Sequence, residues 1–239
     1  MMHDQATITR VYEVLKDTYP TFDEGDDEWM TSGMSDTPFR VIVATALSTV
    51  THSKRVIRAC TALFAEVSTF EGILALTDDE LRELIRPVAH YNMKTLSLKK
   101  MSQQIMDRHD GQIPNTHDEL MALAGIGRKC TDIVMTTLFD ESSVAVDTHV
   151  HRAVNRLGIV HTTTHVATAD ALNRITPFEY KRHAHEWLIQ HGGKVCVAGT
   201  PKCGACPLTD YCDYFQKTRQ SVHGATAQPE LPTKPRTKK

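Results

Sequence analysis

The chain has 239 residues, which is enough for one large domain or for two lobes that each bury a core. Hydrophobic residues make up 41% of it and charged residues 23%, a globular composition that excludes a wholly disordered or fibrous protein. The net charge of −2 excludes a protein that attracts nucleic acid through an overall positive field, so any binding to DNA has to rest on local geometry.

No segment of the sequence predicts a membrane span or a secretion signal. The uncharged run Val41–Ser53 contains 13 residues, fewer than the roughly 20 apolar residues that cross a bilayer. The N-terminus lacks a basic start followed by an apolar run. We therefore expect a cytoplasmic protein without a membrane partner, in a compartment where thiols stay reduced.

Helix-forming patterns run through nearly the whole chain. Apolar residues recur at helical spacing from Ile8 to Leu15, and Thr37 followed by Pro38 predicts the start of an apolar helix. Residues 92–109 form another long amphipathic segment. Because a sustained alternation of period two is absent from the sequence, we predict an all-α fold of about ten helices.

Capping patterns and composition set further boundaries. The capping-box pattern that starts a helix occurs at residues 68–71, 77–80 and 116–119. Residues 217–239 combine prolines, serines and threonines with terminal lysines, and this composition predicts a disordered basic tail.

Four cysteines lie within 17 residues in the pattern C-x6-C-x2-C-x5-C, namely Cys196, Cys203, Cys206 and Cys212. Disulfides are disfavoured in a reducing cytosol. A structural zinc site usually takes its ligands from two short pairs, whereas this loop has one short pair flanked by single cysteines. The spacing favours an iron–sulfur cluster and leaves zinc open. In both cases the metal bonds have to fold the loop.

Two glycines in the run Gly125-Ile126-Gly127-Arg128-Lys129 separate two helical patterns. Glycine allows a tight turn and a close approach of the backbone to a partner. The free N–H groups at the start of the second helix favour an anion. The segment is therefore either a plain connector or a helix–hairpin–helix that grips a DNA phosphate, and its apolar context favours the second. Gly125, Gly127 and Arg128 are the predicted DNA contacts.

Lys129 follows the hairpin directly. A solvated lysine, with a pKa near 10.4, is a poor nucleophile at neutral pH. The start of a helix and the charge of Arg128 disfavour the protonated amine, which would increase the fraction able to attack a sugar carbon. The alternative role for this residue is a surface lysine that contacts a phosphate.

Asp147 is the candidate partner of this lysine. It ends the apolar run Val144–Val146 and precedes a helical pattern, so it is also a candidate N-cap. The two roles are compatible because capping would fix the direction of the carboxylate. His149 and His151 are candidates for phosphate or structural contacts.

These motifs together resemble the endonuclease III family of DNA glycosylases. The resemblance rests on the G-I-G-R-K hairpin, the V-D-T-H motif that contains Asp147, and the four-cysteine pattern, and it covers about residues 10–215. It implies an all-α protein of two lobes on either side of a DNA-binding cleft. Residues 31–143 would form a six-helix barrel with the hairpin, and residues 144–216 the iron–sulfur lobe. Residues 1–30, an N-terminal helix and an acidic loop, would pack with the second lobe.

The resemblance also implies the chemistry. Double-stranded DNA with a damaged base or an abasic site would be the partner, and the damaged nucleotide would flip into the cleft. Lys129 would attack C1′ of the sugar with the help of Asp147, form a Schiff base and nick the strand by β-elimination. The four cysteines would hold a [4Fe–4S] cluster. We thus expect a monomeric, nucleoid-associated base excision repair enzyme that is both a glycosylase for oxidised pyrimidines and an AP lyase.

Three positions depart from the family pattern. Val50 stands where the family usually has a Gln that fills the gap left by the flipped base, and His90 where it usually has a Leu wedge. Lys202 is the one basic residue between Val197 and Lys202, where the family often has more. We expect these three residues to contact DNA, as we do His149, and to alter the preference for the lesion or the opposite base.

Two other functions stay open on the sequence alone. One is a monofunctional glycosylase of the same superfamily that acts on mismatched thymine or uracil, alkylated purines or adenine. The other is a non-catalytic iron–sulfur module that binds DNA. Both are disfavoured because Lys129 and Asp147 are retained in their motifs.

Overall fold

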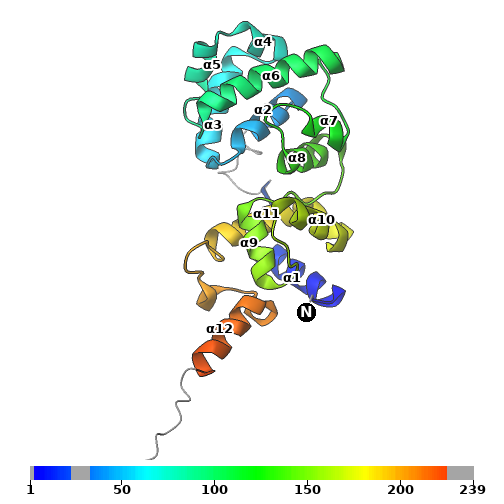
Figure 1. Cartoon of the computed structure of the whole chain (residues 1–239), viewed down its shortest axis with the longest axis vertical. Coiled ribbons are helices and arrows are strands. Elements are labelled where there is room, and N and C mark those ends of the chain that lie inside the picture. Colours follow the sequence, from blue (N-terminus) through cyan, green and yellow to red (C-terminus); the bar gives the residue numbers. More distant parts are fainter. Residues whose placement is uncertain (1–2, 23–32, 225–239) are drawn as a thin grey trace, which may run out of the picture.

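The computed structural model describes residues 3–22 and 33–224, and this part of the chain contains only helices and loops (Figure 1). The all-α prediction is confirmed. The α-helices are α1 (Gln5–Thr18), α2 (Pro38–Ser48), α3 (Ser53–Glu66), α4 (Phe70–Ala75), α5 (Asp78–Leu84), α6 (Tyr91–His109), α7 (His117–Met121), α8 (Arg128–Phe139), α9 (Thr148–Leu157), α10 (His165–Ile175), α11 (Phe178–Lys194) and α12 (Asp213–Gly224). Two short 3₁₀ helices, η2 (Cys203–Ala205) and η3 (Thr209–Tyr211), lie in the cysteine loop. Within the described ranges, no helix is long and apolar enough to cross a membrane.

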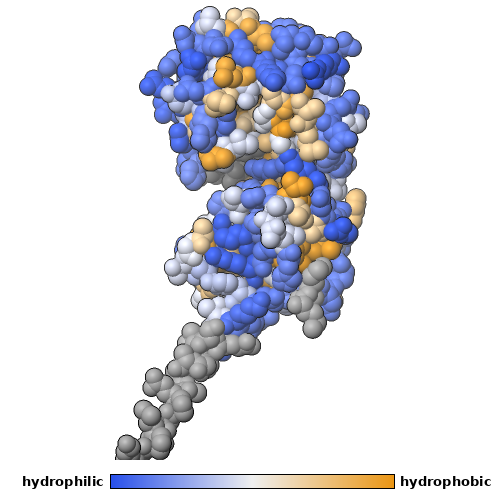
Figure 2. Space-filling model, viewed as in Figure 1, coloured by the Kyte–Doolittle hydropathy of each residue, from blue (hydrophilic) through white to orange (hydrophobic). Residues whose placement is uncertain are grey.

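The helices form two lobes that meet at a waist, which is visible in the ribbon (Figure 1) and in the space-filling view (Figure 2). Helices α2 to α8 make the upper lobe, and α1 with α9, α10 and α11 makes the lower lobe. Each lobe has its own buried apolar core, as the length of the chain allows. The upper lobe contains the helices α2 to α8, of which the five-residue helix α7 and α8 form the hairpin.

Helix α2 runs through the middle of the upper lobe. Its residues Phe39, Val41, Ile42, Val43, Ala44, Thr45, Ala46, Leu47 and Ser48 are buried. A helix that is apolar on all sides is stable only when other elements surround it, and α2 packs against α3, α6 and α8. Its start is fixed as predicted, with Thr37 accepting from the Arg40 N–H and Pro38 in the first turn.

The predicted capping boxes differ in how fully they form. At Thr77 both halves are present, since its side chain accepts from the Glu80 N–H and the Glu80 carboxylate accepts from the Thr77 N–H. At Thr116 the Glu119 carboxylate binds the threonine hydroxyl at 2.6 Å. The box predicted at residues 68–71 is wrong by one residue, because Thr69 is the cap of α4. The Gly72 N–H donates to Thr69 Oγ1 at 3.1 Å.

The lower lobe is built from both ends of the chain. Helix α1 packs against α11, and α11 packs against α9. Two buried polar contacts fix this arrangement. The Tyr12 hydroxyl lies 2.9 Å from Thr176 Oγ1, and the Tyr19 hydroxyl lies 3.0 Å from His191 Nδ1. The predicted packing of the N-terminal helix with this lobe is therefore present in the described residues, whereas the acidic loop expected at residues 23–28 lies outside them.

The chain passes from the upper to the lower lobe just before α9. Val144 and Val146 are buried in the lower core and Ala145 in the upper one. The predicted boundary between residues 143 and 144 lies at this crossing. Asp147 follows it directly, so the candidate catalytic carboxylate is placed where the two cores meet.

The tail departs from its prediction. Helix α12 continues to Gly224, so residues 217–224 are helical rather than disordered. This helix packs against α9. The Arg156 guanidinium lies over the ring of Tyr214, with Cζ 5.0 Å from the centre of the ring. Contact with the lower lobe extends the helix beyond the point where composition alone would end it. Residues 225–239 of the predicted tail lie outside the described residues.

Candidate functional site

A cleft of about 940 Å³ lies between the two lobes. Its walls are the loop after α2, the start of α8, the loop into α9, the start of α10 and one side of α11. The cleft is lined by six of the predicted site residues, Val50, Gly127, Arg128, Lys129, Asp147 and His149. His90 and Gly125 line a smaller adjoining cavity of about 210 Å³, which Val50 also borders.

Glycine has a different structural role at each of the two hairpin positions, 125 and 127. Gly125 has φ +83°, a left-handed conformation, and a Cβ at this position would lie 3.0 Å from Ser97 Cβ. Gly127 has φ −109° and ψ −179°, which any residue adopts, and a Cβ there would meet nothing within 4 Å. Gly127 caps α8 without a side-chain hydrogen bond. The turn therefore requires glycine at 125, whereas at 127 glycine keeps the start of α8 open to an approaching anion.

Lys129 is the second residue of α8 and is half-buried at the wall of the cleft. Its charge acts on Asp147, His185 and Lys94. The structure thus brings the predicted nucleophile and the predicted carboxylate together, one from each lobe.

Asp147 is the N-cap of α9. Its Oδ1 accepts from the N–H groups of His149 at 2.8 Å and Val150 at 2.9 Å. Both bonds use Oδ1, so the second oxygen is not needed for the cap. Burial opposes ionisation, but the hydrogen bond from the Val150 N–H and the positive charge of Lys129 keep the pKa of Asp147 below its usual value. The predicted cap and an ionised carboxylate in the cleft are therefore compatible.

His185 of α11 also lines the cleft, and sequence reasoning missed it. Its Nδ1 lies 2.8 Å from the Ala145 carbonyl oxygen, which can only accept, so Nδ1 carries the proton and Nε2 has a lone pair. Burial and the charge of Lys129 lower the pKa of His185 to about 4, which leaves the ring uncharged at neutral pH. No local motif marks this residue, because its position depends on how α11 packs.

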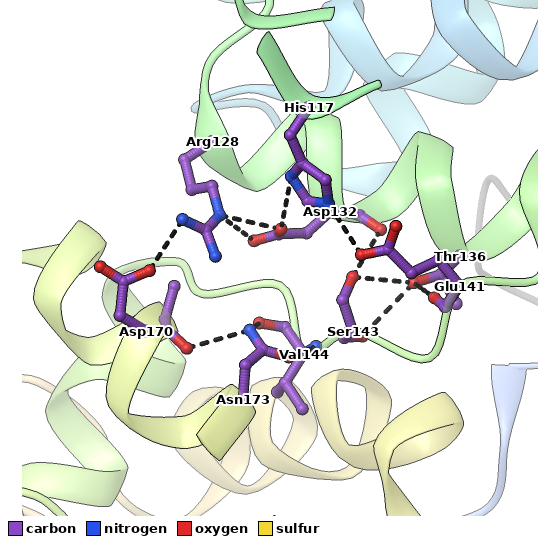
Figure 3. A network of polar contacts seen from close by, with 10 residues as sticks. His117, Arg128, Asp132, Thr136, Glu141, Ser143, Val144, Asp170 and Asn173 are labelled. Atoms are coloured by element: carbon purple, nitrogen blue, oxygen red, sulfur yellow. Dashed lines mark hydrogen bonds and ion pairs between the residues drawn. The ribbon is translucent and has the colours of Figure 1, made fainter. Parts of the chain in front are cut away.

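Arg128 has a structural role that the sequence did not predict. Its Nε donates to Asp132 at 2.9 Å, and its Nη1 donates to Asp170 of α10 at 2.8 Å (Figure 3). The guanidinium therefore joins α8 of the upper lobe to α10 of the lower lobe. The charge of Arg128, which we expected to act on Lys129, is thus paired with two carboxylates.

Val50 and His90 have left-handed backbones although neither is glycine. Their φ angles are 54° and 56°. Val50 is 82% exposed, and His90 is exposed at the start of α6. A β-branched residue in this conformation is strained, and strain of this kind is typical of functional sites. The two residues predicted to fill the gap left by a flipped base are thus presented on two neighbouring loops.

The four cysteines lie in one loop against α9. Burial raises the pKa of the Cys206 and Cys212 thiols, and the charges of Cys196 and Cys203 raise both further. Among the described residues, no three Cys, His, Asp or Glu side chains are grouped closely enough to hold a single metal ion. Four thiols that act on one another within one loop fit the thiolate ligand set of an iron–sulfur cluster.

Two further candidates lie apart from the cleft. Lys202 is exposed in the cysteine loop, and its N–H donates to the Val195 carbonyl at 3.0 Å. His151 binds Thr168 through Nδ1 at 2.6 Å and packs against the ring of His165. The contacts of His151 are those of a structural residue.

Comparison with known proteins identifies the family. Residues 43–178 match the family described as HhH-GPD superfamily base excision DNA repair protein, and residues 196–212 match the iron-sulfur binding domain of endonuclease III. The chain is 35% identical over 182 residues to endonuclease III of Haemophilus influenzae, covering 76% of this chain and 86% of the relative. It is 32% identical over 180 residues to endonuclease III of Escherichia coli K12, covering 75% and 85%.

Solved structures agree with this assignment. A non-covalent endonuclease III–DNA complex superposes with a TM-score of 0.81 at 28% identity, covering 92% of this chain and all of the other. A trapped covalent endonuclease III–DNA intermediate also gives a TM-score of 0.81 at 28% identity, covering 91% of this chain and 100% of the other. The predicted family, two-lobed fold, activity and cofactor are thereby confirmed. The chain belongs to the endonuclease III family and is a base excision repair DNA glycosylase with AP lyase activity, which binds DNA and carries a [4Fe–4S] cluster.

Proposed function

We propose that Lys129 and Asp147 carry out both reactions on a damaged nucleotide flipped into the cleft from double-stranded DNA. The observation that carries this proposal is that an amine from α8 and an ionised carboxylate from the cap of α9 line one cleft. Neither lobe contains the pair alone.

The reaction begins when the uncharged Lys129 amine donates its lone pair to C1′ and the bond from C1′ to the base breaks. The base leaves with the bonding electrons and takes a proton from water. The nitrogen lone pair then opens the sugar ring, and the ring oxygen takes up the proton that the nitrogen gives up, which leaves a Schiff base. Loss of a proton from C2′ expels the 3′ phosphate and nicks the strand.

Asp147 acts electrostatically in this scheme. Because its pKa is held low, its carboxylate stays charged and stabilises the positive charge that develops on the sugar and on the Schiff base. His185 is an uncharged hydrogen-bond acceptor on the wall of the same cleft, since its Nδ1 is fixed by Ala145.

DNA is held by the hairpin and by the two exposed loops. The open start of α8 at Gly127 binds a phosphate through backbone N–H groups. Val50 and His90 enter the space left by the flipped base. Val50 cannot form a hydrogen bond with the unpaired opposite base, so we infer a shifted preference for the lesion or the opposite base. A panel of oxidised pyrimidines opposite each base, assayed with wild type, Val50→Gln and His90→Leu, tests this inference.

Cys196, Cys203, Cys206 and Cys212 are the proposed ligands of the cluster. The cluster supplies cross-links that hold the loop in shape. Arg156 supports the site from α9, because its Nη1 donates to the Val197 carbonyl at 2.7 Å and lies 3.6 Å from Cys196 Sγ.

Borohydride trapping on a duplex with an abasic site tests the assignment of the nucleophile. Wild type and Lys100→Ala, a variant at an exposed lysine of α6, are expected to form a covalent adduct, whereas Lys129→Ala is not. Trapping by a folded Lys129→Ala variant would refute the assignment. Base release by wild type without trapping would indicate a monofunctional enzyme, and binding alone would indicate a non-catalytic module.

A further inference from the structure

Val50 and His90 are held by a shared set of hydrogen bonds whose centre is a buried lysine, Lys94. This side chain is 9% exposed, and its residue lies in the first turn of α6, which follows His90. Its backbone N–H donates to the His90 carbonyl at 3.0 Å. Its ammonium reaches across to the other loop, the one that carries Val50.

The ammonium has three N–H donors, and each has an acceptor in that loop. It donates to the Leu47 carbonyl at 2.7 Å, to the Thr49 carbonyl at 2.7 Å and to Thr51 Oγ1 at 3.2 Å. Two of these acceptors belong to the residues directly before and after Val50. The strained conformation of Val50 is therefore held from both sides by one side chain.

Thr51 provides a second link between the loops. Its hydroxyl accepts from the Ala89 N–H at 3.1 Å as well as from Lys94, and donates to the Thr49 carbonyl at 3.1 Å. Ala89 directly precedes His90. Arg55 adds a third link, because its Nε donates to the Pro87 carbonyl. The loops at Val50 and at His90 are thus one hydrogen-bonded unit.

We propose that Lys94 is a positioning residue that fixes the distance and direction between Val50 and His90, so that both enter the DNA together. The proposal rests on the function assigned above to Val50 and His90. Burial of the Lys94 charge is costly, as the lowering of its pKa to about 8 by burial indicates. Such a buried charge is retained because three acceptors compensate it. The expected consequence of removing it is a looser wedge and weaker recognition of the opposite base.

The chain offers a matched control on the same helix. Lys99 of α6 also donates to two backbone carbonyls, those of Leu74 and Leu76, but these lie at the end of α4. Lys94→Met and Lys99→Met therefore remove the same chemistry from the same helix. Only the first variant releases the loops that carry Val50 and His90.

The first measurement is the fluorescence of 2-aminopurine placed opposite a tetrahydrofuran abasic analogue in a duplex. Binding of wild type and Lys99→Met is expected to change the emission to the same extent, because the opposite base is unstacked. Lys94→Met is expected to give a smaller change at saturating protein. The second measurement is the ratio of the nicking rates on duplex and single-stranded abasic DNA, which is expected to fall about tenfold in Lys94→Met alone. This ratio cancels any effect of Lys94 on Lys129.

Each outcome has one meaning. If Lys94→Met behaves as wild type, or if both variants change equally, the role proposed for Lys94 is overturned. If wild type nicks the duplex but leaves the 2-aminopurine signal unchanged, the wedge assignment of Val50 and His90 fails instead. Should Lys94→Met not fold, Thr51→Val tests the same unit, since it removes the hydroxyl that links Lys94, Ala89 and Thr49.

Discussion

Arg128 of α8 and Asp170 of α10 join the two lobes through an ion pair of 2.8 Å. The Arg128 side chain is 25% exposed and that of Asp170 is 52% exposed. The other partner of Arg128, Asp132, is fully buried. The same guanidinium thus makes one contact that water screens and one that water does not. This difference determines what each substitution does to stability.

We predict that Arg128→Met lowers the free energy of unfolding by about 3–5 kcal/mol, because it leaves the buried Asp132 without its charged partner. Asp170→Asn is expected to lower it by less than about 1 kcal/mol, since that pair is half-exposed. Urea denaturation measures both. The double variant Arg128→Met/Asp132→Asn should recover part of the loss, and no recovery would contradict this explanation.

Stability is predicted to depend on pH through Asp132. Burial raises the pKa of Asp132 from 3.8 to about 6, against the effect of Arg128. The folded protein therefore binds this proton more tightly than the unfolded chain, and the contribution of Asp132 to stability falls as pH rises from about 4 to 6. The difference in unfolding free energy between Asp132→Asn and wild type should move in favour of the variant over this range, by at most about 3 kcal/mol.

Urea denaturation between pH 4.5 and 7.5 measures this change. Ser143→Ala is the control, because it removes the hydroxyl that donates to the Asp132 carbonyl without removing a titratable group. Its difference from wild type should stay constant with pH. A constant difference for Asp132→Asn as well would show that the carboxylate does not titrate in this range.

Capping and catalysis by Asp147 can be separated by two substitutions. Asn caps a helix about as well as Asp, so Asp147→Asn should keep stability within about 0.5 kcal/mol of wild type, whereas Asp147→Ala should lose about 1 kcal/mol. Both remove the negative charge from the cleft and should slow base release about a hundredfold or more. Thermal denaturation measures the effect on stability, and single-turnover assays measure the effect on base release. Normal turnover by Asp147→Asn would restrict this residue to the cap.

The two hairpin glycines should respond differently to alanine. Gly125→Ala is expected to destabilise the protein by about 1–2 kcal/mol, because its φ is +83° and Ser97 lies against the new Cβ. Gly127→Ala should fold with a smaller loss, since its backbone is extended and the space is open. Its methyl group would stand in front of α8 and weaken duplex binding about tenfold. Equal DNA affinity of Gly127→Ala and wild type would exclude the proposed phosphate contact.

The sequence predicted those features that depend on neighbouring residues. The cap at Thr77, the hairpin around Gly125, and Asp147 as the cap of α9 all follow from short patterns with a local physical cause. The Ser68 box was wrong because two adjacent hydroxyl residues could both serve as the cap, and the choice of Thr69 follows from the packing of α4 against α6.

Features that depend on distant residues were not predictable in this way. His185 enters the cleft because α11 packs on α9, and Arg128 meets Asp170 across 42 positions of the chain. The sequence likewise does not indicate that the Lys94 ammonium crosses to the loop at Val50. In each case a polar group finds its partner only after helices that are distant in the sequence have packed together.

The lower lobe combines α1 with helices that follow the whole upper lobe in the sequence, and this order constrains how a newly made polypeptide matures. Helix α1 is synthesised before the whole upper lobe, yet Tyr12 and Tyr19 form their hydrogen bonds only with Thr176 and His191, which are synthesised more than 160 residues later. The upper lobe has all its residues available well before then and can fold while translation continues. A nascent chain that stops before α11 would therefore present a folded hairpin with Lys129 but no opposing wall, and the capacity to cut DNA arises only after α11 has been synthesised.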